Sequence, residues 1–264
     1  MTSTLQLRSI QLRVSDLARS VDFYVRQLGL SVIAQGLAHA DLATTPSSPA
    51  ILTLQSDATA PAAEPDAAGL FHAALLLPSA PALGAWLKFA SQAGVEFDGA
   101  SDHGVSEAIY FTDPDGNGLE FYCDRPRTVW PRTSGGELAM VTQPLNVPTL
   151  VAGASPPSAR PLAGASWGHL HLRVTDLARS DAFYRTQLGM DLMQGSYPGA
   201  RFLAADGYHH HVAINTWGHP RRPRSATALG LAAATFSRAG LAADQLLTDP
   251  DGIALRLTPL TDSP

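Results

Sequence analysis

The stretch LRVSDLARSVDFYVRQLGL at residues 12–30 returns as LRVTDLARSDAFYRTQLGM at residues 172–190. Thirteen of the nineteen positions are identical at an offset of 160 residues, so the chain contains an internal repeat. In each copy an apolar segment is followed by a Ser-Asp or Thr-Asp pair typical of a helix start. Apolar residues then recur at helical spacing up to a glycine. The repeat therefore predicts a strand, a helix and then further strands.

A second motif repeats at a different offset. TDPDGNGLEFY at residues 112–122 returns as TDPDGIALRLT at residues 248–258, which is 136 residues later. Pro-Asp-Gly between β-rich segments is typical of a tight hairpin turn. Because the offset falls from 160 to 136, the last part of the chain is about 24 residues shorter than its counterpart. We therefore expect four related units, of which the fourth is truncated and has little room for a helix.

Segments rich in Pro, Gly, Ser and Ala separate these units. The longest, residues 126–166, predicts a connector between two halves, and residues 57–68 separate units one and two. We accordingly expect one domain at residues 1–125, with units one and two. A second domain is expected at residues 167–264, with unit three and the truncated unit four.

The composition excludes several classes of protein. The chain has 264 residues, 45% of them hydrophobic, and its 18 basic and 23 acidic residues give a net charge of −5. This charge gives no electrostatic reason to expect a nucleic acid or an acidic membrane as partner. The single cysteine, Cys123, cannot form an intramolecular disulfide, and no segment approaches the roughly 20 apolar residues that span a bilayer. We expect a cytoplasmic protein with no nucleic-acid or membrane partner.

The nine histidines are unevenly distributed. Seven of them lie in units two and three, namely His72, His103, His169, His171, His209, His210 and His211. Histidine is the commonest metal ligand and also the side chain that titrates near neutral pH, so these two units are where we expect the chemistry.

The segments that carry these histidines resemble a known family. GLFHAALLLP, SDHGVSEAIYFTDPDGNGLEFYCDRPR, GHLHLRVTDL and GYHHHVAINTW resemble sequences of the vicinal oxygen chelate superfamily, which includes glyoxalases, bleomycin-resistance proteins and extradiol dioxygenases. They are most similar to the two-domain catechol 2,3-dioxygenase-like proteins. The resemblance implies an α+β fold in which four βαβββ modules form two open half-barrels, here with a truncated fourth module. It also implies metal ligands on the first and last strands of a module.

These ligand positions are occupied only in the middle of the chain. The first-strand position holds His72 in unit two and His169 in unit three, while the last-strand position holds Glu120 in unit two and one of His209–His211 in unit three. In unit one, the first-strand position holds Ser9 and the last-strand position holds Thr53 or a neighbour. In unit four, the first-strand position holds one of Leu231–Ala233 and the last-strand position holds Arg256. Pairing of sequential units would split the ligands between two cups. If unit two pairs with unit three, and unit one with unit four, a single cup contains all the ligands. We favour this crossed pairing.

Two histidines and one carboxylate form the facial triad that leaves coordination positions open on non-heme Fe(II). We therefore predict that His72, His169 and Glu120 bind Fe(II), with Mn, Zn and Ni as alternative metals.

The resemblance also implies three catalytic residues. Tyr110 corresponds to a tyrosine that hydrogen-bonds the bound substrate, His103 to a histidine beside the substrate oxygens, and His211 to a histidine that acts as acid and base. A pKa near 6.5 suits histidine to take a proton from a phenol and return it. Alternation along a strand would place His209 and His211 on one face and His210 on the other. We assign the catalytic role to His211.

Together these features predict an enzyme, an extradiol ring-cleaving dioxygenase of aromatic hydrocarbon catabolism that uses a small aromatic diol and O₂. Two alternatives stay open. A metal-dependent glyoxalase-like lyase or isomerase would usually have a second carboxylate in place of one histidine. A binding protein of the bleomycin-resistance kind needs a cup but no metal. Because the missing helix of unit four would leave part of its sheet uncovered, we also expect a homodimer.

Overall fold

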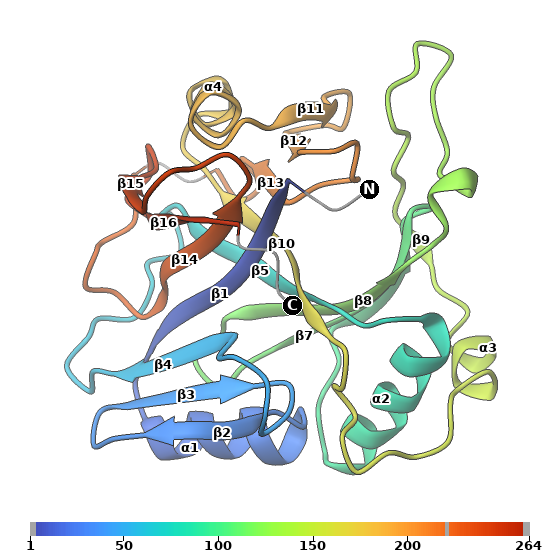
Figure 1. Cartoon of the computed structure of the whole chain (residues 1–264), viewed down its shortest axis with the longest axis vertical. Helices are drawn as coiled ribbons and strands as arrows, with labels where there is room; N and C mark the ends of the chain where they lie inside the picture. The colour runs from blue at the N-terminus through green and yellow to red at the C-terminus, as the bar shows by residue number, and fades with distance from the viewer. Residues whose placement is uncertain (1–3, 220–221, 261–264) are drawn as a thin grey trace.

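The computed structural model describes residues 4–219 and 222–260. In these ranges the chain forms two curled mixed β-sheets, with helices packed against them (Figure 1). One sheet has seven strands and the other has nine. The predicted α+β fold with two half-barrels is therefore confirmed.

The seven-stranded sheet combines the first and last parts of the chain. Its strands, in spatial order, are β15 (Gln245–Thr248), β16 (Ala254–Pro259), β14 (Gly230–Arg238), β1 (Leu5–Val14), β4 (Leu52–Ser56), β3 (His39–Ala43) and β2 (Ser31–Gln35). At its centre β1 and β14 run antiparallel, and each has a parallel neighbour, β4 and β16 respectively. Units one and four therefore share a sheet.

The nine-stranded sheet combines the two middle units. Its strands, in spatial order, are β11 (Asp191–Gln194), β12 (Ala200–Ala204), β13 (Val212–Asn215), β10 (Ser166–Arg173), β5 (Gly69–Leu76), β8 (Gly118–Asp124), β7 (Ser106–Thr112), β6 (Gly99–Asp102) and β9 (Gln143–Pro144). Its centre repeats the pattern, with β10 and β5 antiparallel and with β13 and β8 as their parallel neighbours. The predicted crossed pairing is thus confirmed.

Three main helices flank the sheets. The helices are α1 (Leu17–Asp22), which continues into a π-helical turn (Phe23–Gln27), α2 (Ala80–Gln92) and α4 (Leu177–Leu188). Asp16 and Asp176 cap the first and last of them, because their side chains accept hydrogen bonds from backbone N–H groups three residues later. Residues 230–259, all of them described, contain three strands and no helix, in agreement with the predicted truncation. None of the helices described is long and apolar enough to cross a membrane.

The two repeated motifs contact each other across units. The backbone N–H and the hydroxyl of Ser15 donate to the carboxylate of Asp115 at 3.1 and 2.6 Å. The hydroxyl of Tyr24 donates to the buried carboxylate of Asp113 at 2.9 Å. The TDPDG turn of unit two therefore holds the start of the helix of unit one.

The second copies of the motifs make the same contacts. Thr175 donates to Asp251 through its N–H and its hydroxyl, and the Tyr184 hydroxyl donates to Asp249 at 2.8 Å. The TDPDG turns thus do more than reverse the chain. They join sequential units through side chains, while the sheets join unit one with four and unit two with three.

Residues 126–166 connect β8 to β10 and are more structured than a plain connector. They contain a 3₁₀ turn (Arg127–Val129), the edge strand β9 and the short helix α3 (Val147–Ala152). Leu138, Met140 and Leu150 are buried. Apolar residues within this Pro/Gly-rich segment therefore anchor it to the nine-stranded half.

Candidate metal centre

Three buried side chains converge from adjacent strands of the nine-stranded sheet. His72 lies on β5, Glu120 on β8 and His169 on β10, and they are 7%, 2% and 1% exposed. Oε2 of Glu120 is 2.9 Å from Nε2 of His72 and 3.3 Å from Nε2 of His169. One ligand atom from each residue lies within 4.8 Å of the other two. The structure thus brings together the three residues that the sequence predicted as metal ligands.

The strand register shows which residue of unit three corresponds to Glu120. Glu120 lies opposite Ala74, and Ala213 lies opposite His171. Ala74 and His171 each follow the first-strand histidine of their unit by two residues. Ala213, which is fully buried, therefore occupies the position that we had placed among His209–His211. The prediction was wrong because those histidines lie in a bend before β13 and not within the strand.

The protonation states of these residues suit metal binding. Burial opposes ionisation of Glu120, but the two neighbouring histidines outweigh it and hold the pKa of the carboxyl well below its usual value. Burial lowers the pKa of His169 to about 4, although Glu120 acts in the opposite direction. Near neutral pH the site therefore presents a carboxylate and a neutral imidazole, the forms in which these residues bind metals.

The donor set fits a divalent cation. A carboxylate that is almost fully buried carries a charge that is costly in a protein interior, and the neutral imidazole of His169 does not compensate it. A cation held by Glu120, His72 and His169 would compensate it. Nε2 of His169, which faces Glu120, is the nitrogen that would bind the cation. Nδ1 of the same ring is buried and has no hydrogen-bond partner within the described ranges.

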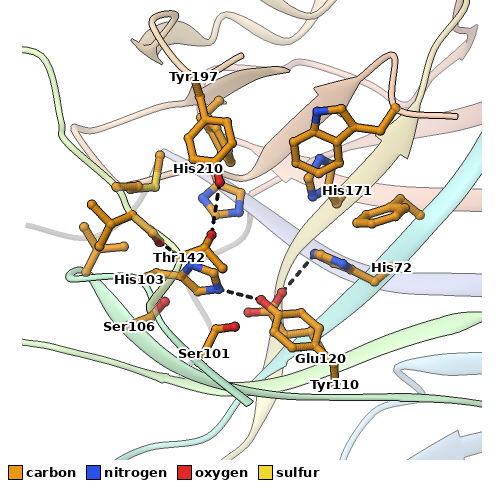
Figure 2. Close-up of a pocket in the computed structure, with 16 residues that line it drawn as sticks. His72, Ser101, His103, Ser106, Tyr110, Glu120, Thr142, His171, Tyr197 and His210 are labelled. Atoms are coloured by element: carbon orange, nitrogen blue, oxygen red, sulfur yellow. Dashed lines mark hydrogen bonds and ion pairs between the residues drawn. The ribbon is translucent and has the colours of Figure 1, made fainter. Parts of the chain in front are cut away.

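A cavity of about 270 Å³ opens beside the three residues (Figure 2). His72 and Glu120 line it, whereas His169 does not. Most of the wall is apolar, formed by Phe71, Val105, Met140, Val141, Phe202 and Trp217. Among the described residues the lining contains no lysine or arginine. The cavity therefore suits a small, flat and largely apolar molecule whose polar end faces the predicted ligands.

Tyr110 and His103 form a hydrogen-bonded pair on the cavity wall (Figure 2). Nδ1 of His103 is 2.6 Å from the carbonyl oxygen of Val141, and Nε2 is 2.6 Å from the hydroxyl oxygen of Tyr110. A carbonyl only accepts, so Nδ1 carries the proton and Nε2 accepts one. Burial and the adjacent Glu120 raise the pKa of Tyr110 well above its ordinary value. The pair is therefore a neutral phenol next to an imidazole that can accept a proton.

The structure places His210 on the cavity wall, while His211 lies outside this cavity. Nδ1 of His210 is 2.8 Å from Nδ1 of His209, whose Nε2 is 2.8 Å from Asp124. Nδ1 of His211 accepts a hydrogen bond from the backbone N–H of Ala205 instead. Strand alternation does not apply to these three residues, because they lie in a bend and the side chains of His209 and His210 contact each other.

Most of the aromatic and hydroxyl side chains around the cavity opening could not be predicted from the sequence. The rings of Phe71, His171 and Trp217 contact one another, with centroids 5.0 to 5.5 Å apart. Thr142 and Tyr197 approach from the other side, with their hydroxyl oxygens 3.1 Å apart (Figure 2). Four of these residues lie in the connector, in loops or at the outer side of a strand, where no periodic pattern marks them. His171 is the exception, because it shares a strand face with His169.

Comparison with known sequences supports the same family. The model of the Glyoxalase/Bleomycin resistance protein/Dioxygenase superfamily matches residues 6–121 and 166–249. A catechol-2,3-dioxygenase of Bacillus subtilis (strain 168) is 38% identical over 226 residues, which cover 84% of this chain and 78% of the relative. The chain therefore belongs to the glyoxalase, bleomycin-resistance and dioxygenase superfamily, and it is a homologue of a catechol-2,3-dioxygenase.

Solved structures share the fold. A protein of Bacillus subtilis subsp. subtilis str. 168, provisionally described as a dioxygenase, has a TM-score of 0.65 and 12% identity, with coverage of 100% of this chain and 87% of that one. Glyoxalase I of Zea mays has a TM-score of 0.59 and 16% identity, with coverage of 97% and 93%. At these identities the likeness concerns the fold alone, which serves more than one chemistry.

Proposed function

We propose that this protein is an Fe(II)-dependent extradiol dioxygenase that opens the ring of a catechol-type aromatic with O₂. The observation that carries the proposal is the convergence of His72, Glu120 and His169 beside an apolar cavity. Fe(II) bound by these residues would supply open coordination positions for two vicinal substrate oxygens and for O₂. The catechol-2,3-dioxygenase homologue supports the same activity.

The residue equivalent to Glu120 favours this reaction over that of a glyoxalase-like enzyme. Ala213 occupies that position, so unit three adds no second carboxylate. A site with three protein ligands keeps more positions open than one with four, and oxygen chemistry needs a position for O₂ in addition to those of the substrate.

The residues of the cavity wall would handle the protons. We propose that the hydroxyl of Tyr110 accepts a hydrogen bond from a substrate hydroxyl while it donates to Nε2 of His103, so that the proton lost by the substrate is relayed through Tyr110 to His103. The acid/base role that the sequence assigned to His211 passes in this proposal to His210, because His210 lines the cavity. The ring of His210 lies 4.0 Å from that of His169, measured between centroids.

The wall also favours uncharged substrates. A catechol with a carboxylate substituent would bury its charge against side chains such as Phe71, Phe202 and Trp217, with no lysine or arginine from the described cavity lining to compensate it. We therefore propose catechol and its alkyl-substituted derivatives as substrates, ahead of catechols that carry an acid group.

Anaerobic reconstitution tests the function. Protein loaded with Fe(II) is mixed with catechol or 4-methylcatechol, air is admitted, and the yellow ring-opened product is followed by absorbance. Parallel samples loaded with Mn, Zn or Ni test the metal. If iron binds stoichiometrically and no product forms from several catechols, a glyoxalase-like lyase or isomerase becomes the better proposal. If no metal binds, the bleomycin-resistance type of binding protein does.

We propose a cytoplasmic homodimer in aromatic hydrocarbon catabolism, with domains at residues 1–125 and 167–264 joined by residues 126–166. The single, buried Cys123 is compatible with a reducing compartment. Leu246 on β15, which is 81% exposed, supports a contact at the helix-free end of the seven-stranded sheet. Light scattering after size exclusion that shows a monomer would contradict the dimer.

A further inference from the structure

A second cavity, of about 170 Å³, lies where the two sheets meet at one end. It shares no lining residue with the cavity of the metal centre. Its walls include Gly69, Asn117, Arg173, Arg224, Ala228 and Gly230. We call it the arginine cavity. Both sheets contribute to it, because Gly69 and Arg173 belong to the nine-stranded sheet and Gly230 to the seven-stranded one.

The internal repeat places two arginines symmetrically at this end. Arg13 and Arg173 are equivalent positions of the repeat, at the ends of β1 and β10. Arg13 lies opposite Gly230 and Arg173 lies opposite Gly69. Both glycines have positive φ, 109° and 146°, which side chains rarely adopt. The strand partners of the two arginines therefore bear no side chain, and a Cβ at Gly69 would lie 3.7 Å from Cδ of Arg224.

Among the described residues, neither Arg173 nor Arg224 forms an ion pair with a carboxylate. Nε of Arg173 is buried without any hydrogen-bond partner in the part of the chain that the structure describes. Arg224 donates to the carbonyl oxygen of Ala228 at 2.9 Å, and Arg13 donates to the carbonyl oxygens of Ala226 and Ala228. Burial and the nearby Arg13 lower the pKa of Arg224, although the charge of Asp249 acts in the opposite direction. The cavity thus gathers positive charge that carbonyl dipoles only partly compensate.

The acidic residues of the same cavity are engaged elsewhere. Asp115 accepts hydrogen bonds from Ser15 and pairs with Arg19. Glu64 forms an ion pair with Arg222 at 2.9 Å. Neither of these two carboxylates is therefore free to pair with the cavity arginines, and a partly buried guanidinium that lacks an ion-pair partner is unfavourable.

We propose that the arginine cavity binds a small oxyanion of the phosphate class, held by Arg173 and Arg224. Guanidinium groups present forked N–H donors that match the oxygen atoms of such anions, and two of them suit a dianion. The volume of about 170 Å³ admits a small inorganic anion. Because the walls come from both sheets, the bound anion would tie the sheets together at this end and stabilise the folded chain.

Thermal unfolding of the full chain, with inorganic phosphate as the probe, tests this site. Phosphate at low millimolar concentration, compared with chloride at the same ionic strength, is expected to raise the Tm of the wild type by about 3 °C or more. Arg173→Gln and Arg224→Gln should abolish this shift. Arg26→Gln is the matched control, because this arginine is exposed, pairs only weakly with Asp22 at 3.3 Å and does not line the cavity. It should keep the full shift.

Two further results decide the matter if a variant folds poorly. Arg173→Lys keeps the charge and should retain part of the Tm shift that phosphate causes. Isothermal titration of the wild type should give one phosphate per chain. Without phosphate, Arg173→Gln should be at least as stable as the wild type, because it removes an uncompensated charge. A wild type whose Tm responds equally to phosphate and chloride, or an Arg173→Gln variant that keeps the phosphate shift, would overturn the proposal.

Discussion

The two sheets share one arrangement of central strands, yet only the nine-stranded sheet holds a candidate metal centre. The strand registers align them residue by residue. The matched positions, with the seven-stranded sheet first, are Ser9 with His169, Ala233 with His72 and Arg256 with Glu120. The backbone therefore offers the same three positions twice, and the side chains alone decide where a metal can bind.

The polar groups on the seven-stranded sheet satisfy one another. Arg256 forms an ion pair with Asp244 on the neighbouring loop, and the hydroxyl of Thr53 donates to Asp41. In the nine-stranded sheet, the buried carboxylate of Glu120 lies against His72, His169 and the hydroxyl of Tyr110, and it forms no ion pair with a lysine or arginine of the described chain. The polar groups of the seven-stranded sheet are therefore paired within the protein, whereas the buried carboxylate of Glu120 is the group that a bound cation would neutralise.

The largest effect is expected when the same substitution, to glutamine, is made at matched positions of the two sheets. Glu120→Gln removes the only formal negative charge of the three predicted ligands, so iron affinity should fall by about 10²-fold or more, and ring cleavage should be lost with it. Arg256→Gln, at the equivalent position of the other sheet, should leave both unchanged. Iron content per chain and the rate of product formation measure the two effects. Stoichiometric iron in Glu120→Gln would remove this residue from the metal site.

The repeats explain why so much of this comparison was predictable from the sequence. An exact offset of 160 residues aligned His169 with Ser9, and the shared TDPDG motif aligned Glu120 with Arg256, so the units that carry the predicted ligands could be identified without a structure. The register of β13 was not visible, because the repeat loses its identity after the helix. Ala213 was therefore missed.

The cavity wall was less predictable for a different physical reason. Met140 and Thr142 reach the cavity from a segment whose Pro/Gly-rich composition predicts only a connector. Their position depends on tertiary contacts such as the hydrogen bond from the N–H of Met140 to Gln194, which no local pattern records. His210 was ambiguous by one residue, since alternation has no meaning in a bend.

A second carboxylate in the nine-stranded sheet should affect ring cleavage without loss of the metal. Ala213→Glu adds a carboxylate at the position equivalent to Glu120, so the metal should stay bound while ring cleavage falls about tenfold or more, because a fourth ligand fills an open position. Ala213→Gln has the same size and a weaker ligand, and it separates coordination from overpacking. Equal loss in both variants would mean that bulk, and not coordination, blocks the reaction.

The two sheets should also differ in their response to acid. Burial lowers the pKa of His211, beside the nine-stranded sheet, to about 4. The unfolded chain has the ordinary value near 6.5, so between these values it binds a proton that the folded chain refuses. This contribution to stability is therefore complete above about pH 6.5 and is lost as the pH falls towards 4, with a total on the order of 3 kcal/mol.

Urea unfolding at pH 7.5 and pH 5 measures this effect. The loss of stability between the two pH values should be smaller in His211→Gln than in the wild type, with unchanged iron content at pH 7.5 because His211 lies outside the metal cavity. His39→Gln, on an exposed position of β3, is the control in the other sheet and should keep the wild-type difference. An equal loss of stability between pH 7.5 and pH 5 in both variants would mean that groups other than His211 cause the acid sensitivity.

The smallest expected effect concerns a feature that the two halves share. Tyr24→Phe leaves the buried carboxylate of Asp113 without one hydrogen bond, and Tyr184→Phe does the same to Asp249. Each change should lower the free energy of unfolding by about 1–2 kcal/mol, because each removes a donor from a buried acceptor. Chemical denaturation should give two similar values, since the geometry is the same at 2.9 and 2.8 Å. If only Tyr24→Phe were costly, the contact between units one and two would matter more than its copy, and the halves would be equivalent in shape but not in stability.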